Sequence, residues 1–377
     1  MNSITALSHL SDPERCPLLV VKLGSSLLVN SDGALRRDWL AGLVAELAVL
    51  HRAGQRIVIV SSGAIALGAA RLGLPQRGRA SLPDAQAAAS VGQVELAGLY
   101  ADVLGAQGLV AAQILLTLED MEDRRRYLNA SATLERLLDL GAVPVVNEND
   151  SVATEEIRFG DNDRLAARVA QASGADAVLL FSDVDGLYDR PPHQDGAVLV
   201  PQVDIIDHTV RSAAGPPQEG PGTGGMASKL AAAEIATRAG IVLAIANGTH
   251  DRPLSRVFEQ NIGTMFIAQN GPGARKNWLG GRLAKAGTVR VDGGCHAALA
   301  RGASVLAAGI IAVEGEFARG DFVGIADEQG AEIALGLIEY DAATCRSLMG
   351  KRQDAQADIL GYAPRSAVIH RDHMVML

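Results

Sequence analysis

Two lysines stand in loops whose neighbouring residues suit the binding of an anion. Lys22 lies near the end of the apolar run LLVVKL and is followed by Gly24, Ser25 and Ser26, while Lys229 ends the glycine-rich segment GPGTGGMASK. A buried ammonium group is unfavourable unless it meets an anion, and glycine lets backbone amides approach a phosphate where a helix begins. The pattern predicts two phosphate-binding loops. For Lys22 alone, a side chain that extends from the sheet edge into water is an equal alternative.

The glycine-rich segment lacks the marks of two common nucleotide motifs. No Gly-Lys-Ser/Thr tripeptide stands at the spacing of a Walker A loop, and no apolar strand precedes the segment as in a dinucleotide fingerprint. An enzyme that binds NAD is therefore disfavoured.

Short polar segments follow further apolar runs, at the points where strands would end. They suit an amino acid's charged groups, a metal ion or a nucleotide, although capped helices and solvated turns are the alternatives. The segments are Ser61 with Ser62, Asn147–Ser151, Phe159–Asp163, and Ser182 with Asp183.

Continuous apolar runs alternate with Ala- and Leu-rich stretches in the first two thirds of the chain. Such runs are typical of strands that are buried on both faces, and the alternation predicts an α/β fold with an open, mostly parallel sheet covered by helices on both faces. The predicted strands are 18–23, 56–60, 143–146, 177–181 and 241–245, and the predicted helices are 39–52, 85–105 and 228–239. Ligands bind such sheets at the carboxyl ends of the strands, where the polar segments lie.

The pattern changes near residue 270. Short alternating runs with glycine between them predict a small β-rich domain with one short helix near His296–Arg301. We expect the first domain at 15–270, a linker at 271–285 and the second domain at 286–377. The second domain balances 12 Lys or Arg against 12 Asp or Glu from residue 275 onward, so the net charge of −9 belongs to the first domain.

Composition narrows the class of protein. Hydrophobic residues make up 48% of the 377 residues and charged residues 20%, which suits a large folded core. The negative charge argues against bulk attraction to nucleic acid. The three cysteines are not clustered and the chain shows no apolar leader, which predicts a cytoplasmic protein. The chain also lacks a long apolar run, which predicts no membrane span.

Taken together, six motifs resemble the glutamate 5-kinase family, a branch of the amino acid kinases. In chain order they are Lys22-Leu-Gly-Ser-Ser, Val60-Ser-Ser-Gly-Ala-Ile, Met121-Glu-Asp-Arg, Asn147-Glu-Asn-Asp, Gly160-Asp-Asn-Asp and Gly222-Thr-Gly-Gly-Met-Ala-Ser-Lys. The resemblance covers nearly the whole chain, since the last hundred or so residues resemble the PUA domain of the bacterial enzymes. Each motif alone would be weak, and their combination is specific to the family.

The resemblance implies a role for particular side chains. Lys22 and Lys229 would be catalytic, and Asp161 would orient them. Ser62, Asp150 and Asn162 would bind glutamate. The ATP-binding residues would be Lys22, Ser182, Asp183, Thr223, Gly224, Gly225, Met226, Ala227, Ser228 and Lys229.

The implied reaction is phosphoryl transfer from ATP, with Mg²⁺, to the side-chain carboxylate of L-glutamate, as the first step toward proline. A carboxylate is already ionised at neutral pH, so the lack of an obvious catalytic histidine agrees with this reaction. The resemblance also implies feedback inhibition by proline, a homo-oligomer, and transfer of the product to glutamate-5-semialdehyde dehydrogenase. It leaves any protein ligands of Mg²⁺ open.

Other functions remain as alternatives at this point. The same scaffold serves kinases that act on other carboxylates, on carbamate or on nucleoside monophosphates. A protein whose PUA-like domain binds RNA is a further alternative, although that domain lacks a basic stripe.

Overall fold

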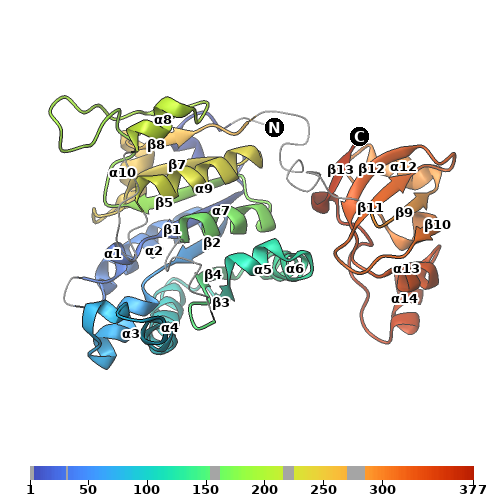
Figure 1. Ribbon diagram of the computed structural model, residues 1–377, viewed down its shortest axis with the longest axis horizontal. Coiled ribbons are helices and arrows are strands. Elements are labelled where there is room, and N and C mark those ends of the chain that lie inside the picture. The colour runs from blue at the N-terminus through green and yellow to red at the C-terminus, as the bar shows by residue number, and fades with distance from the viewer. Residues whose placement is uncertain (1–3, 31–32, 153–161, 215–224, 270–284) are drawn as a thin grey trace. The chain divides into compact units, whose positions relative to one another are not determined.

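The computed structural model describes residues 4–30, 33–152, 162–214, 225–269 and 285–377 (Figure 1). The chain forms two compact units. The first comprises Met1–Glu122 and Ala130–Gln269, and the second comprises Asp123–Asn129 and Asn270–Leu377.

An eight-stranded sheet forms the centre of the first unit. Its strand order is β3-β4-β2-β1-β5-β7-β8-β6, and all neighbouring pairs are parallel except β7 with β8. The predicted mostly parallel sheet is therefore confirmed. The strands are β1 Leu18–Leu23, β2 Arg56–Ser61, β3 Ala111–Leu116, β4 Val143–Glu148, β5 Ala177–Ser182, β6 Gln202–Val203, β7 Val242–Asn247 and β8 Thr264–Phe266.

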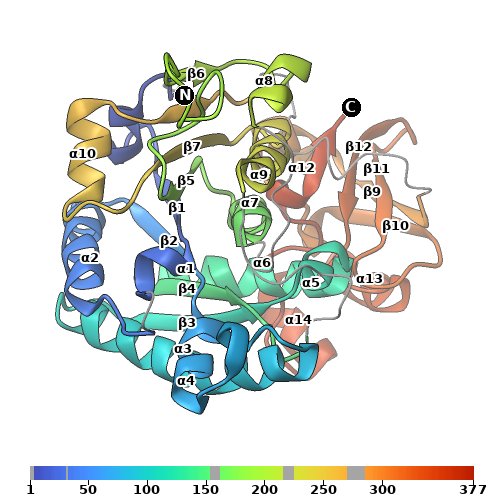
Figure 2. The ribbon, with the colours of Figure 1, turned by 60° about the vertical axis from the view of Figure 1, so that its left-hand side comes forward.

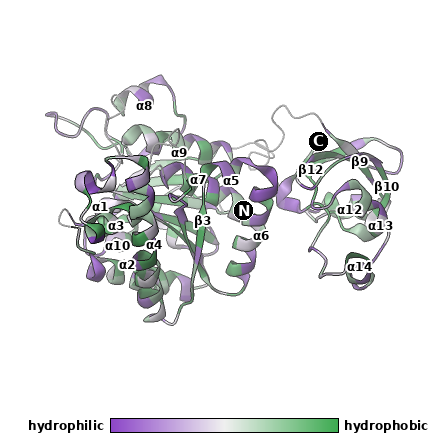
Figure 3. Cartoon of the chain, turned by 60° about the horizontal axis from the view of Figure 1, so that its bottom comes forward, coloured by the Kyte–Doolittle hydropathy of each residue, from purple (hydrophilic) through white to green (hydrophobic). Residues whose placement is uncertain are grey.

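Helices lie on both faces of this sheet, as Figure 2 shows. On one face, α2, α4 and α10 pack against the sheet, and α7 and α9 pack together on the other. The helices are η1 Leu7–Ser11, α1 Ser25–Leu28, α2 Arg37–Arg52, α3 Ala64–Leu72, η2 Pro75–Gly78, α4 Leu82–Gly105, α5 Leu118–Glu122, α6 Arg124–Asp139, α7 Asn162–Ser173, α8 His208–Ala213, α9 Met226–Arg238 and α10 Pro253–Gln260. Hydrophilic residues gather on outer helices such as α6 and α8 (Figure 3).

The side chains of β1 alternate between the two helical layers. Leu19, Val21 and Leu23 belong to the core cluster that contains residues of α2 and α4. Successive side chains of a strand point to opposite faces, so Lys22 points toward the layer of α7 and α9. This alternation decides which helices can supply partners for the lysine.

The helices α3 and α4 approach each other unusually closely. A Cβ atom added to Gly68 would lie 1.7 Å from the carbonyl oxygen of Ala88, and one added to Gly92 would lie 1.9 Å from that of Ala64. Glycine is therefore required at both positions for this packing. The short turn η2 connects these two helices and packs against both of them.

The second unit contains a five-stranded sheet of order β10-β9-β11-β12-β13. Its strands are β9 Gly287–Val291, β10 Ile310–Gly315, β11 Phe322–Ala326, β12 Glu332–Leu337 and β13 Met374–Met376. The expected β-rich character is confirmed, but the expectation of a single helix is wrong. Within residues 285–377 the helices are α12 Gly293–Leu299, α13 Ala342–Leu348 and α14 Gln353–Leu360, together with the 3-10 turns η3 Ala307–Gly309 and η4 Arg371–His373.

Candidate active site

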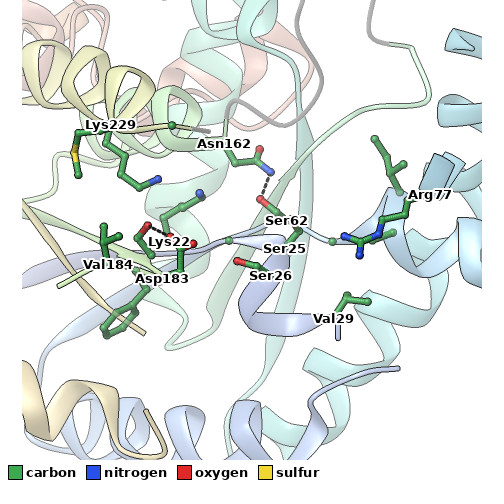
Figure 4. Close-up of a pocket in the computed structure, with 18 of the residues that line it drawn as sticks. Lys22, Ser25, Ser26, Val29, Ser62, Arg77, Asn162, Asp183, Val184 and Lys229 are labelled. Carbon is green, nitrogen blue, oxygen red and sulfur yellow. Dashed lines mark hydrogen bonds between the residues drawn. The ribbon is translucent and has the colours of Figure 1, made fainter. Parts of the chain in front are cut away.

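A cavity of about 1020 Å³ opens beside the carboxyl ends of β1, β2 and β5 (Figure 4). Its lining comes from the segments that follow these strands and β4, from α3 and the turn after it, and from the first residues of α7 and α9. Parallel sheets present their ligand sites at this edge, because the loops after the strands converge there. Of the residues predicted to carry function, the lining includes Lys22, Ser62, Asp150, Asn162, Ser182, Asp183, Gly225, Met226, Ala227 and Lys229.

Two lysines and one carboxylate form the most buried charged group at the cavity. Lys22 Nζ lies 2.5 Å from Asp163 Oδ1, and Lys229 Nζ lies 2.9 Å from Asp163 Oδ2. The Asp163 side chain is 1% exposed and the two lysine side chains are 7% and 6% exposed. One carboxylate thus bridges two ammonium groups, and the cluster carries a net charge of +1 next to the cavity.

Three elements place this cluster. Lys22 points from β1 toward the layer of α7 and α9, Asp163 is the second residue of α7, and Lys229 is the fourth residue of α9. The Ser228 hydroxyl also donates to Asp163 Oδ2, at 3.5 Å. The two lysines are 207 positions apart in the sequence, and the contact between α7 and α9 brings them together.

The charge state of Asp163 follows from its surroundings. Burial by itself would raise the pKa of this carboxyl group, but Lys22 and Lys229 outweigh burial and lower the pKa to about 2. Asp163 is therefore ionised at neutral pH and compensates part of the buried positive charge.

A hydrogen-bonded amide network lies beside the lysine cluster. Asn162 Nδ2 donates to the Ser62 hydroxyl at 2.7 Å, to the Ser61 carbonyl at 3.0 Å and to Asn147 Oδ1 at 3.2 Å. Asn147 in turn donates to Gln93 Oε1 at 2.7 Å. These bonds fix the orientation of the Asn162 side chain, whose buried Oδ1 has no hydrogen-bond partner among the described residues.

Asp150 is a second buried acceptor at this end of the cavity. Its side chain is buried, and its Oδ1 has no hydrogen-bond partner within the described part of the chain. Burial raises the pKa of Asp150 to about 6, and the positive charge of Arg79 acts in the opposite direction. An acceptor that can be ionised, belongs to a cavity lining and lacks a partner among the described residues suits a cationic ligand group.

The residues after β5 line the other end of the cavity. Ser182 donates from its hydroxyl to Asp183 Oδ1 at 3.1 Å, and Val184 and Tyr188 continue the lining. In Figure 4, Asp183 and Val184 lie on the side of Lys229, whereas Ser62 and Arg77 lie on the opposite side, with Asn162 between them. The cavity therefore has two chemically different ends, and the lysine cluster lies nearer to the end with Asp183 and Val184.

Comparison with known proteins assigns the chain to a family. Residues 17–247 match the model of the amino acid kinase family, and residues 287–360 match that of the PUA domain. A glutamate 5-kinase of Novosphingobium aromaticivorans is 57% identical, over 99% of this chain and 100% of its own length. A glutamate 5-kinase of Sphingopyxis alaskensis is 58% identical over 97% and 99%, and one of Brucella anthropi is 49% identical over 95% of each chain.

This chain belongs to the amino acid kinase family. The relatives that it matches over nearly full length are named glutamate 5-kinase, which confirms the resemblance drawn from the six motifs. The PUA domain match confirms the expected character of the second unit.

Most of the predicted site residues of this amino acid kinase line the cavity. Ser62, Asp150 and Asn162 lie together at one end of the cavity, and Ser182 and Asp183 lie at the other. Ser228 contacts Asp163 and does not line the cavity. Asp161, Thr223 and Gly224 lie outside the described residues, and their roles stay predictions.

Sequence reasoning missed several residues at the site. Asp163 is predicted only as part of a polar segment, yet it bridges both lysines. Gln93 and Arg79 were not considered at all. The repeated Asp in GDND was the one available signal for Asp163, whereas nothing in the sequence pattern brings Gln93 to Asn147 or Arg79 to the cavity.

Among the described residues of this amino acid kinase, no group of three or more His, Cys, Asp or Glu side chains is arranged to bind a metal ion. The same part of the chain contains no helix with both the length and the apolar character needed to cross a bilayer.

Proposed function

We propose that this chain is a glutamate 5-kinase, which transfers the γ-phosphoryl group of ATP to the side-chain carboxylate of L-glutamate and forms L-glutamyl 5-phosphate. The observation that carries the proposal is the lining of one cavity. It includes the two lysines that Asp163 bridges, and it includes Asp150 and Asn162, whose buried Oδ1 atoms have no hydrogen-bond partner among the described residues. The names of the full-length relatives agree with it.

The nucleophile in this reaction needs no base. The γ-carboxylate of glutamate is ionised at neutral pH, so the protein has to align two anions and stabilise the charge of the phosphoryl group in transfer. Lys22 and Lys229 supply the positive charge. Asp163 fixes both ammonium groups before the substrates bind, so that little reorganisation is needed in the transition state.

The amino-acid end of the cavity matches the backbone groups of glutamate. Asp150 and Asn162 Oδ1 accept from the α-ammonium group, since both are buried acceptors without a partner among the described residues. The Ser62 hydroxyl accepts from Asn162 Nδ2, which leaves its own proton available for a substrate carboxylate.

The nucleotide end involves Ser182, Asp183 and the first turn of α9. The helix α9 begins at Met226 with Gly225 as its N-cap, and a helix N-terminus favours phosphate. Mg²⁺ that accompanies ATP would neutralise part of the phosphate charge at this end of the cavity.

Proline is proposed as an inhibitor that competes with glutamate. Proline carries an α-carboxylate and a secondary ammonium group, so it can use the acceptors Asp150 and Asn162, and it lacks a γ-carboxylate that could react. Binding of the two amino acids is then mutually exclusive.

Proline titrated into the full chain at several glutamate concentrations should give inhibition that glutamate relieves. Inhibition that persists at saturating glutamate would contradict a shared site. Three further properties stay predictions: that the chain is cytoplasmic, that it forms a homo-oligomer, and that it passes its product to glutamate-5-semialdehyde dehydrogenase.

ADP release measured with a panel of acceptors tests the proposed substrate. L-Glutamate should support turnover, whereas L-aspartate should be poor because its carboxylate is one methylene short of the lysines. N-Acetylglutamate should also be poor, because it lacks the ammonium group that pairs with Asp150. UMP is included as an acceptor because some kinases of the same fold phosphorylate nucleoside monophosphates. Faster turnover with N-acetylglutamate or UMP than with glutamate would contradict the proposal.

A further inference from the structure

We propose that Arg79 binds the α-carboxylate of the amino-acid substrate and makes the enzyme specific for substrates that carry this charge. The inference rests on the proposed function, because it concerns the same cavity and the same acceptor. None of the residues expected from the sequence supplies a cation for this carboxylate, although Asp150 supplies an anion for the neighbouring ammonium group.

Arg79 lies in the cavity lining together with Ser62, Asp150 and Asn162. The residue is half-buried, and its Nε atom is buried without a hydrogen-bond partner in the described ranges. A guanidinium group carries five N–H donors in a planar fork that matches a carboxylate. An unsatisfied donor at a cavity wall is therefore suited to a ligand anion.

The local charges point to the same end of the substrate. Burial lowers the pKa of Arg79, and the negative charge of Asp150 opposes this effect. Asp150 likewise has a buried oxygen without a partner in the described part of the chain. A carboxylate and a guanidinium that line the same cavity, each with a buried polar atom that lacks a partner in the described ranges, are complementary to the ammonium and carboxylate of one amino acid.

The backbone before Arg79 is held in an uncommon conformation. Gln76, Arg77 and Gly78 have φ values of +49°, +55° and +74°, in the left-handed region that residues other than glycine seldom adopt. A Cβ atom at Gly78 would lie 2.9 Å from Cβ of Ala69 on α3. Strain of this kind persists where the surrounding structure imposes it, often at ligand sites. Here it turns the chain at the mouth of the cavity directly before Arg79.

The phosphates of ATP are a poorer explanation for Arg79. The lysine cluster lies on the side of Asp183 and Val184, and Figure 4 shows Ser62 and Arg77 on the other side of Asn162. The negative charge of Asp150 acts on Arg79 and would repel a phosphate there. The anion that fits this end is the carboxylate attached to the same carbon as an ammonium group.

Steady-state kinetics on glutamate and isoglutamine test the assignment. Isoglutamine keeps the ammonium group and the γ-carboxylate and replaces the α-carboxylate with a neutral amide. Wild type should favour glutamate. In Arg79→Gln, kcat/KM for glutamate should fall at least about thirtyfold, mainly through KM, because a charge-assisted bidentate contact is lost. The value for isoglutamine and KM for ATP should stay within about threefold.

Two further variants complete the test. Arg79→Lys should recover part of the preference for glutamate, since lysine keeps the charge without the fork. Arg71→Gln, at an exposed position in the last turn of α3, should behave as wild type. If Arg79→Gln does not fold, the same ratio is measured in Arg79→Lys, where an unchanged preference overturns the proposal.

The outcomes separate this proposal from the proposed function. An active wild type whose preference for glutamate over isoglutamine is absent, or is unchanged in Arg79→Gln, overturns the role of Arg79 only. Equal losses on both substrates also overturn it, because they indicate a structural role. A wild type that phosphorylates neither compound but phosphorylates another acceptor overturns the proposed function instead.

Discussion

Replacement of Asp163 by asparagine should remove the charge that holds the two lysines, with little change in volume. At the observed separations of 2.5 and 2.9 Å, each pair has a gross Coulomb attraction of about 6 kcal/mol at an effective dielectric of about 20. Desolvation offsets much of this, and loss of one partner from a buried pair typically lowers the free energy of unfolding by about 3–5 kcal/mol. For a unit of this size we expect Tm to fall by roughly 6–15 °C.

ATP should partly restore the stability of Asp163→Asn, because its phosphates bring negative charge to the two ammonium groups that Asp163 bridges in wild type. The rise in Tm at saturating ATP should therefore be larger in the variant than in wild type, whereas AMP, which lacks the β- and γ-phosphates, should give a smaller rise. We also expect kcat to fall at least about tenfold, since the lysines are no longer held in position.

The matched control is Asp102→Asn. Asp102 forms an ion pair with Arg37 at 2.7 Å, a distance between those of the two Asp163 pairs, but the side chains are 62% and 57% exposed. An exposed pair contributes at most about 1 kcal/mol, so Tm should change little. Scanning calorimetry with and without nucleotide measures all three proteins. A Tm and a kcat of Asp163→Asn equal to those of wild type would refute the reasoning.

The remaining predictions concern the lysines, the amino-acid end and the fold. Lys22→Ala and Lys229→Ala should each lower kcat at least about a hundredfold in steady-state assays, and a folded variant with near-normal kcat would remove that lysine from the mechanism. KM for glutamate should fall as pH rises from 5 to 7, because Asp150, with its pKa raised to about 6 by burial, gains the charge that pairs with the ammonium group. Asp150→Asn should have a higher KM for glutamate that no longer varies with pH in this range, and a retained pH dependence would assign it to another group. Gly68→Ala should lower the free energy of unfolding by at least about 2 kcal/mol in denaturant titrations, since its methyl group would collide with α4, and unchanged stability would show that the two helices can move apart.

The central strands could be predicted because they are continuous apolar runs. The strand β3 was missed because its side chains are mostly half-exposed and Gln113 interrupts the apolar pattern, and β8 was missed because it has only three residues. The helices α13 and α14 were missed because they are short amphipathic segments in a region dominated by strand-like alternation. In each case the contacts of the folded chain, rather than local preference, determine the element.

The position of Ser62 and Ser182 at the site could be predicted, because each stands where a predicted strand ends. The bridge by Asp163 was not predictable, because the phase of α7 decides which of its own side chains point to the lysines. Arg79 depends on a turn with positive φ at Gln76, a residue type that gives no sign of this conformation. Such contributions become visible only when the backbone is known.

Trapping of the product with hydroxylamine tests the central claim most directly. The purified chain is incubated with ATP, Mg²⁺, L-glutamate and hydroxylamine, and γ-glutamyl hydroxamate and ADP are measured together. Phosphorylation of the side-chain carboxylate predicts hydroxamate in amounts equal to ADP, with both products reduced at least about a hundredfold in Lys229→Ala. Release of ADP that depends on glutamate but yields no hydroxamate, or no release of ADP at all, would contradict the account.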